Sequence, residues 1–582
     1  MRIKSRNTTA AALVAALALF AGACGDSKDS GDNASTGTDS ETKTTAPASD
    51  ACRTLEFEDA PEGGTLEDYA QLSSAGDNTS FDPGAVQTLD ESQVTTALFD
   101  GLTDFDFTDT CNPTIEPLVA EKWEANDDAT EYTFTIKKDQ VFSNGEPVLP
   151  SSFKRGWERS GSKELASAYG YLLTYVKDGD KLLDGSMTTL DSIVADDDAM
   201  TLKVTLASPN ADFPAIVSFP SFSPISKEDF ARVGNTTGWG TKGATIGNGP
   251  FKLESAESPD TGTVVLVRND TWAGNIFGDK KAKLDKIVFH LTSEVTASFQ
   301  AFESGQGDTA TIPPGQFGPA MEQYPNTVDS AMLGTYFFDF GHDDSNVGGE
   351  KNVKLRAAIS MAIDRDEINA KVYEGTRFIS TGITPPGIPG FESNLCTYCS
   401  YDPTEAKKLL KEWKDDGGKI DGDIKISINT GGGHKDVAAI IQSNVKATLG
   451  IDLTIDLIDE DYFKVIAKEG ACQICRSGWY ADYPTYGNFM VDLFGAVSID
   501  GNNLGRYDDK KFESFIADAQ KETDDTKRGE LYASAEKRLL NETVNAIPIN
   551  WYTGDHVYRD SVVNYVQPPL GIFLWEKVGK NG

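Results

Sequence analysis

Basic side chains are scarce in this 582-residue sequence: 53 Lys and Arg stand against 90 Asp and Glu, which leaves a net charge of −37. Phosphate backbones repel a chain of this charge, so nucleic acid is not an expected partner, and neither is a membrane surface bound through a basic face. We interpret the acidity as a solubility trait and not as a requirement for a cationic ligand.

Histidine is also rare. The four occurrences, at His290, His342, His434 and His556, are isolated, and each is interpreted as a surface or core residue and not as a metal ligand. The sequence shows no internal repeat. No Ser-His-Asp arrangement can be assigned, because the members of such triads are distant along a chain. We therefore predict no enzyme, no cofactor and no metal site.

Long apolar runs are limited to one, at residues 10–23, which follows the basic residues Arg2, Lys4 and Arg6. The run is too short to span a bilayer comfortably and has the flanks of a signal peptide, which we place at residues 1–23. The small residues before Cys24 resemble the lipobox of bacterial lipoproteins. This resemblance implies that Cys24 receives lipid and becomes the mature N-terminus. Ala21 stands where the lipobox usually has Leu, so ordinary signal cleavage beside Cys24 is the alternative.

Large apolar side chains are missing from residues 26–50, which consist mostly of Ser, Thr, Asp, Gly, Lys and Ala. A segment of this composition cannot bury a core. Residues 24–50 are therefore predicted to be the lipidated cysteine and a flexible tether. The body of the protein is expected on the outer face of the cell membrane, held there by the lipid.

Six further cysteines would lie in this oxidising compartment: Cys52, Cys111, Cys396, Cys399, Cys472 and Cys475. An even number favours disulfides. Our hypothesis is a Cys52–Cys111 disulfide and two more among the other four, with their pairing open. The two Cys-x-x-Cys pairs could instead form a four-cysteine zinc site, which would be closed and structural.

Hydrophobic periodicity predicts the main elements of the body. Alternating apolar residues predict a strand at 132–136, and helical spacing predicts an amphipathic helix over 352–365 with Arg356 on its polar side. Asp402 and Pro403 have the residue types of an N-cap and a first helical position.

The region 424–457 shows a strand, a helix and a second strand in succession, which predicts an α/β domain with at least two parallel strands. Gly450 is expected to end the helix. The loop of Gly431, Gly432 and Gly433 before the helix could hold an anion, but we interpret it as a connector.

One segment stands out for its chemistry. Asp482 lies among Trp479, Tyr480, Tyr483 and Tyr486, and Arg476 precedes it by six residues. Aromatic walls lower the local dielectric constant, so a carboxylate among them binds a cation more strongly. The alternative is an aromatic loop that fills a core, with Asp482 capping a turn.

Six segments, taken in order, resemble the oligopeptide- and dipeptide-binding solute receptors of bacterial ABC importers. They are residues 123–136, 141–147, 249–253, 354–365, 401–403 and 478–483. The resemblance implies an α/β fold of two lobes and an extra domain, with the ligand cleft between the lobes and closure by hinge motion. It also implies domain limits: lobe one at 51–93, 206–330 and 546–582, the extra domain at 94–205, and lobe two at 331–545.

The same resemblance implies a ligand and its contacts. Asp482 would pair with the α-ammonium of a short peptide and Arg476 would lie near its carboxylate, with Trp479, Tyr480 and Tyr483 around them. The peptide would bind as an added strand, and a monomeric receptor would deliver it to an ABC permease. An oligosaccharide, an opine or a metal chelate in the same cleft is the alternative, and an extracellular zinc hydrolase is a further one.

Overall fold

The computed structural model of the protein describes residues 51–69, 81–86, 88–236, 245–254, 262–290, 295–328, 330–458 and 461–582. The predicted signal peptide, the lipidation site Cys24 and the tether lie outside these residues. Within the described part of the chain, no helix combines the length and the hydropathy that a membrane span requires.

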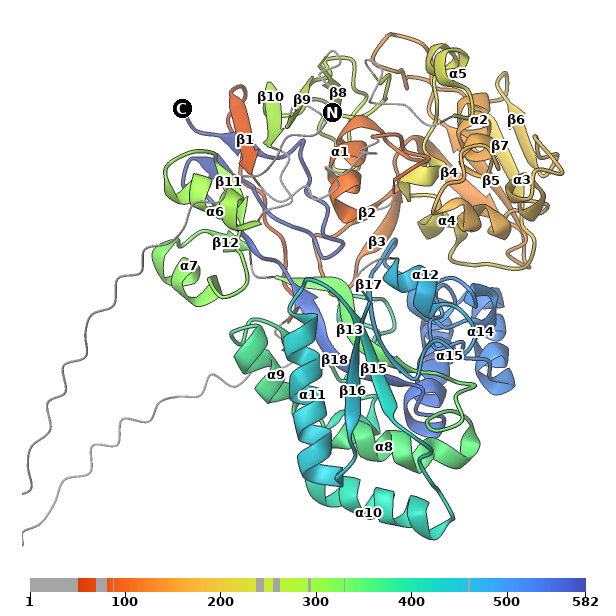
Figure 1. Ribbon diagram of the computed structural model, residues 1–582. Coiled ribbons are helices and arrows are strands. Elements are labelled where there is room, and N and C mark those ends of the chain that lie inside the picture. The colour runs from red at the N-terminus through yellow and green to blue at the C-terminus, as the bar shows by residue number, and fades with distance from the viewer. Residues whose placement is uncertain are drawn as a thin grey trace, which may run out of the picture. The chain divides into compact units, whose positions relative to one another are not determined.

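A mixed sheet of seven strands organises lobe one, with the strand order β12-β19-β11-β1-β10-β9-β8 (Figure 1, upper left). Strand β1 is parallel to both of its neighbours, and the other pairs are antiparallel. Helix α1 packs on this sheet, since its Val94 and Leu98 share a core with Leu66, Ile287 and Trp575. The elements are β1 (Thr65–Tyr69), α1 (Leu89–Leu98), α5 (Lys227–Val233), β8 (Phe251–Leu253), β9 (Thr263–Arg268), β10 (Lys286–His290), α6 (Val295–Glu303), β11 (Thr309–Thr311), α7 (Phe317–Gln323), β12 (Thr327–Val328) and β19 (His556–Tyr558).

The extra domain is built on a four-stranded antiparallel sheet of order β4-β5-β7-β6 (Figure 1, upper right). Helix α2 packs on it through the fully buried Phe153 and Trp157, and the Trp157 indole donates a hydrogen bond to the carbonyl of Phe222 at 2.7 Å. The elements are β2 (Thr103–Asp106), β3 (Thr114–Pro117), β4 (Ala120–Ala125), β5 (Glu131–Ile136), α2 (Pro150–Ser160), η2 (Gly170–Tyr175), α3 (Asp180–Leu183), β6 (Ile193–Asp196), β7 (Thr201–Thr205), α4 (Phe213–Ile216) and η3 (Pro220–Phe222).

Lobe two contains a six-stranded sheet of order β14-β18-β13-β17-β15-β16 (Figure 1, lower half). Strands β13 and β18 are buried along their whole length. The elements are β13 (Ala331–Phe340), η5 (Glu350–Asn352), α8 (Val353–Met361), α9 (Arg365–Val372), β14 (Phe378–Ile379), η6 (Thr397–Cys399), α10 (Pro403–Asp415), β15 (Ile424–Asn429), α11 (His434–Leu449), β16 (Leu453–Ile458), α12 (Tyr462–Ile466), β17 (Ile474–Tyr480), α13 (Tyr486–Met490), η7 (Ala496–Ser498), α14 (Lys510–Lys521), α15 (Asp525–Lys537), η8 (Arg538–Glu542) and β18 (Ala546–Thr553). A short pair, β20 (Val562–Val563) and β21 (Gly579–Lys580), ends the chain.

The strand–helix–strand prediction is confirmed. Strand β15 pairs with β16 in parallel from Ile424 opposite Leu453 onward, with α11 between them in sequence. Gly450 ends α11 with φ +71°, a conformation that favours glycine. Asp402 caps α10 by accepting hydrogen bonds from the backbone N–H groups of Thr404 and Glu405.

The single helix predicted over 352–365 is wrong, because two helices occupy this region. Helix α8 ends at Met361, and Asp364 then caps α9 by accepting a 2.9 Å hydrogen bond from the N–H of Glu367. Arg356, expected on the polar side, is buried. Its guanidinium donates to the carbonyls of Val347, Thr543 and Val544 and so ties α8 to the start of β18.

Three of the expected domain limits also need correction. The limit between 205 and 206 assigns α4 and η3 to lobe one, whereas their Phe213 and Phe222 share a core with Trp157 of the extra domain. The limit between 93 and 94 cuts through α1, whose C-terminal half packs in the core of lobe one. The limit between 545 and 546 assigns β18 to lobe one, whereas β18 pairs with β13 and β14 in the sheet of lobe two. Because a buried central strand cannot be separated from its sheet, lobe two extends to Thr553.

The six cysteines form three disulfides, Cys52–Cys111, Cys396–Cys399 and Cys472–Cys475. The first is the pair expected from the sequence, and the other two settle the pairing that the sequence left open. Each Cys-x-x-Cys pair closes on itself, so the four cysteines do not form a zinc site. In the described part of the chain, no three His, Cys, Asp or Glu side chains come close enough together to hold a metal ion.

Candidate functional site

Strand β17 has a free edge. It pairs with β13 over seven residues, but with β15 only at Ile474 and Cys475. From Arg476 to Tyr480, no other described strand pairs with β17 on the side away from β13. An exposed strand edge of this kind presents backbone donors and acceptors to which an extended peptide can add.

Asp482 lies two residues beyond the end of this edge, and its side chain is partly exposed. The Asn488 side chain donates a 3.1 Å hydrogen bond to the Oδ2 atom of Asp482, and the hydroxyl of Tyr171 in the extra domain lies 3.5 Å from the same atom. Burial raises the pKa of Asp482 to about 7; the charge of Asp492 also raises it, while hydrogen bonds from Asn488 and from the Tyr169 and Tyr171 hydroxyls act in the other direction.

Asn488 organises this loop, although no pattern in the sequence singles it out. Its Oδ1 atom accepts hydrogen bonds from the Trp479 indole at 2.8 Å and from the N–H of Asp482 at 3.0 Å. Its amide nitrogen donates to both Asp482 and Asp492. One fully buried amide therefore holds the two carboxylates and the indole in place.

The predicted contact residues divide into two groups. Trp479 is half-buried and Tyr480 is 40% exposed, so both are accessible along the free edge. Tyr483, in contrast, is 1% exposed and donates a hydrogen bond to Asp492, as does Tyr175 of the extra domain. Tyr483 thus supports the loop from beneath, and we exclude it from the candidate contacts.

The guanidinium of Arg476 lies at the other end of the edge. The group lies 5.2 Å from the ring centre of Tyr336 and 5.7 Å from that of Phe463. Its Nε atom is buried without a hydrogen-bond partner, and no described carboxylate forms an ion pair with it. Burial alone would lower the pKa of Arg476, but the phenolic groups of Tyr552 and Tyr336 raise it, so the side chain stays cationic.

His434, which the sequence presented as isolated, belongs to this end of the site. It begins α11, and its Nδ1 atom lies 3.1 Å from the hydroxyl of Tyr336, the same ring that contacts Arg476. Burial and the charge of Arg476 lower the pKa of His434 to about 3, so it is neutral at physiological pH. In the sequence, the run of three glycines before His434 was the feature that could have pointed to it.

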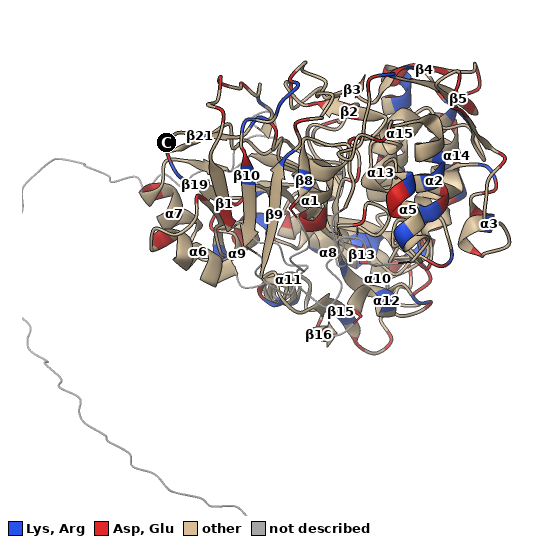
Figure 2. Ribbon diagram, turned by 90° about the horizontal axis from the view of Figure 1, so that it is seen from above, with Lys and Arg blue, Asp and Glu red and all other residues tan. Residues whose placement is uncertain are grey.

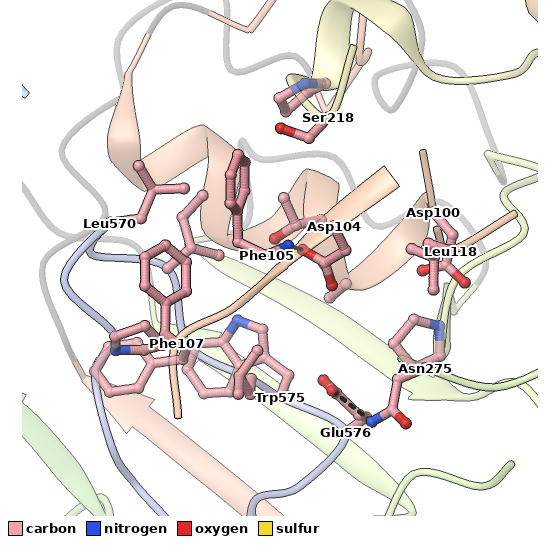
Figure 3. Close-up of a pocket in the computed structure, with 18 of the residues that line it drawn as sticks. Asp100, Asp104, Phe105, Phe107, Leu118, Ser218, Asn275, Leu570, Trp575 and Glu576 are labelled. Carbon is pink, nitrogen blue, oxygen red and sulfur yellow. Dashed lines mark hydrogen bonds between the residues drawn. The ribbon is translucent and has the colours of Figure 1, made fainter. Parts of the chain in front are cut away.

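Two cavities adjoin the edge. The β17 cavity, of about 690 Å³, lies between the extra domain and lobe two and is lined by Tyr169, Tyr171, Phe463, Gly478, Trp479 and Leu504. The acidic cavity, of about 110 Å³, lies next to Asp482 and is lined by residues of lobe one and the β2 region (Figure 3).

Positive and negative side chains are separated at the site but mixed over the rest of the protein. Asp and Glu occur on helices and loops throughout the view of Figure 2, with Lys and Arg interspersed. The site, in contrast, separates the signs, because Asp482 and Arg476 stand six residues apart. Such an arrangement suits a ligand with a cationic end and an anionic end.

Comparisons with known proteins show what the whole chain is similar to. The family model for bacterial extracellular solute-binding proteins, family 5 Middle, matches residues 114–500. The dipeptide-binding protein DppE of Bacillus subtilis is 28% identical over 475 residues, which cover 80% of this chain and 84% of DppE. The periplasmic oligopeptide-binding protein OppA of Salmonella typhimurium is 29% identical over 521 residues, 87% of this chain and 92% of OppA.

Solved structures show the same architecture. The periplasmic binding protein DppA from Helicobacter pylori, in complex with the peptide STSA, superimposes with a TM-score of 0.71 and 23% identity. The match covers 90% of this chain and 99% of DppA. The predicted α/β fold of two lobes is therefore confirmed.

Proposed function

Because the chain belongs to the bacterial extracellular solute-binding proteins of family 5, we propose that it captures short peptides outside the cytoplasm and delivers them to an ABC permease. The observation that carries this proposal is the free edge of β17, bounded by Asp482 at one end and Arg476 at the other. The peptide adds as a strand, its α-ammonium pairs with Asp482, and its carboxylate faces Arg476. The β17 cavity gives its side chains room without dictating their identity.

The names of the relatives support a peptide ligand, since DppE is a dipeptide-binding protein and OppA an oligopeptide-binding protein. The charges of the site support it independently. A buried guanidinium without an anionic partner is costly, and a peptide carboxylate would supply that partner. The ring of Tyr336 contacts this guanidinium, and His434 lies within hydrogen-bond distance of the Tyr336 hydroxyl.

Isothermal titration calorimetry with tetra-alanine tests the ligand class. We expect N-acetylation of the peptide, and separately Asp482→Ala, to weaken binding at least 30-fold, because removing one partner of a buried charged pair costs about 2–5 kcal/mol. Asp508→Asn, which changes an exposed carboxylate elsewhere in lobe two, is the matched control and should bind like wild type.

Two outcomes would contradict the proposal in different ways. Equal binding of the acetylated and the free peptide would show that Asp482 is not the contact of the α-ammonium. Binding of an oligosaccharide, an opine or a metal chelate, with no heat from any peptide, would keep the receptor fold and replace its ligand.

Location and delivery are further parts of the proposal. A lipid on Cys24 would hold the receptor at the outer face of the membrane, close to its permease. We expect the wild-type protein to partition into detergent in a cloud-point extraction and Cys24→Ser to stay in the aqueous phase. In cells, Asp482→Ala should reduce uptake of a labelled peptide to the level of a strain without the receptor. Light scattering of the purified protein should give the mass of a monomer, since one chain supplies the whole edge.

A further inference from the structure

The acidic cavity brings together carboxylates from distant parts of the chain. Asp100 follows α1, Asp104 is on β2 and Glu576 is near the C-terminus, and all three line the same space of about 110 Å³. Asp482 lines it as well, so the cavity opens beside the proposed ammonium contact. Figure 3 shows Asp100, Asp104 and Glu576 on one side, and Phe107, Trp575 and Leu570 on the other.

Two of the three carboxylates have an oxygen without a donor among the described residues. Asp100 is only 7% exposed; its Oδ2 accepts a 2.7 Å hydrogen bond from the Trp272 indole, and its Oδ1 has no such donor. The N–H of Phe105 donates to one oxygen of Asp104 at 2.8 Å, and the second oxygen of Asp104 has no such donor. Glu576 accepts a 3.0 Å hydrogen bond from Asn275 and another from its own backbone N–H.

The carboxyls of the cavity also lack a cationic partner among the described residues. No described Lys or Arg forms an ion pair with Asp100, Asp104 or Glu576. The two lysines with influence there are engaged elsewhere, since Lys137 donates to the carbonyl of Leu118 and Lys577 pairs with Asp279. Burial raises the pKa of Asp104 to about 7 and also raises those of Asp100 and Glu576. A cation that enters the cavity would stabilise the ionised form of these carboxyls.

The arrangement favours an extended organic cation over a metal ion. In the described part of the chain, no three acidic side chains converge closely enough for metal coordination. A guanidinium has five N–H donors in a plane and can reach several separated carboxylates at once. Its alkyl stem would pack against the aromatic side of the cavity, as the stems of Arg and Lys do on apolar surfaces.

We propose that the acidic cavity receives the basic side chain of the first residue of a bound peptide, so that the receptor prefers peptides that begin with Arg or Lys. The inference rests on the proposed function. If the α-ammonium pairs with Asp482, the first side chain starts one bond from the carbon that carries this ammonium. It is then the side chain closest to the cavity that Asp482 lines.

The test compares peptides that differ only in charge. Isothermal titration calorimetry of the mature protein is carried out with Arg-Ala-Ala-Ala, with its citrulline-first analogue, which is similar in shape and neutral, and with Ala-Arg-Ala-Ala. We expect the Arg-first peptide to bind at least tenfold more tightly than the other two. Asp104→Asn and Glu576→Gln should each reduce the ratio of affinities between the Arg-first and the citrulline-first peptide at least threefold.

The outcomes separate the two proposals. If the three peptides bind equally well and all need a free α-amine, the receptor function stands and the preference for a basic first residue is wrong. The same holds if both variants weaken every peptide equally. If no peptide binds, both proposals fail. Thermal unfolding of each variant shows whether it is folded, and two variants in different elements keep the test decisive if one is not.

Discussion

Peptide affinity should depend steeply on pH through Asp482. The pKa of this carboxyl is about 7, because desolvation between the extra domain and lobe two and the charge of Asp492 both raise it. An α-ammonium binds the ionised form. Binding therefore requires loss of the proton at pH values below 7, and the affinity falls as the pH is lowered.

The size of the effect follows from the fraction ionised. Half of the receptor carries an ionised Asp482 at pH 7, and about one in a hundred at pH 5, so the dissociation constant should rise about 50-fold, or about 2.3 kcal/mol. The α-ammonium of the peptide, with a pKa of about 8, sets the upper limit, so affinity should be highest between about pH 7 and 8. Asp492, whose pKa burial raises to about 6, shares the proton with Asp482 and broadens the curve.

Calorimetry with tetra-alanine from pH 5 to pH 8 measures this dependence. In buffers of different ionisation enthalpy, binding at pH 6 should release close to one proton. Tetra-alanine avoids the acidic cavity, where burial raises the pKa values of the carboxyls. Asp482→Asn should bind weakly and with little pH dependence. A change of less than threefold between pH 7 and pH 5 in the wild-type protein would refute the assignment of Asp482 as the ammonium partner.

Three further predictions concern other parts of the molecule. Replacing Arg476 by Lys should weaken the binding of a tetrapeptide with a free carboxylate about tenfold and leave the binding of its C-terminal amide almost unchanged. The reason is that a compact ammonium on a flexible stem does not replace a planar guanidinium over Tyr336. Equal losses for both peptides in calorimetry would contradict this. At pH values above 7, Asp104→Asn should raise the melting temperature by a few degrees, because ionisation of the buried native carboxyl destabilises the folded state there. Because the native pKa of Asp104 lies above that of the unfolded chain, this gain should shrink as the pH falls from 7 to about 4, and a gain independent of pH would speak against the cause. Removal of the Cys52–Cys111 disulfide, which closes 59 residues, should lower the free energy of unfolding by about 4 kcal/mol in denaturant titrations. Removal of Cys396–Cys399, which closes three, should lower it by about 2 kcal/mol. The reverse order would show that loop entropy does not govern the contribution of these bonds.

Local elements could be predicted from the sequence because their causes are local. Asp402 caps α10 through hydrogen bonds to residues two and three positions away, and the parallel pairing of β15 and β16 follows from one short connection. The helix over 352–365 was predicted as one because apolar spacing continues across Met361, whereas the cap at Asp364 that starts a new helix is a single side-chain hydrogen bond.

The site could be predicted only at its two charged ends. Asp482 and Arg476 lie in one short segment, so their spacing was visible. The groups that set their properties were not, because Tyr171 is 311 residues from Asp482 and Tyr336 is 140 residues from Arg476. Tyr483 was chosen for its aromatic ring beside Asp482, but the turn after Ala481 directs it to Asp492 in the core. The acidic cavity was beyond reach, since Asp100 and Glu576 lie near opposite ends of the chain.

The extra domain contributes directly to the site, which the order of the elements along the chain does not suggest. Its η2 segment supplies Tyr171 to Asp482 and Tyr175 to Asp492, so the carboxylates of lobe two are buried and hydrogen-bonded by another domain. The chain passes between the two large sheets at residues 328–331 and 553–556, and these crossings are tied by the hydrogen bond from the N–H of Gly554 to the carbonyl of Ser330. If the lobes open about these crossings, Asp482 and Asp492 move with the sheet of lobe two, and any loss of contact with η2 would expose them to water. Their pKa values would then fall towards those of ordinary carboxyls. Lobe closure and ionisation of Asp482 would then be coupled, and a bound ammonium would stabilise the closed form by pairing with a carboxylate whose ionisation burial opposes.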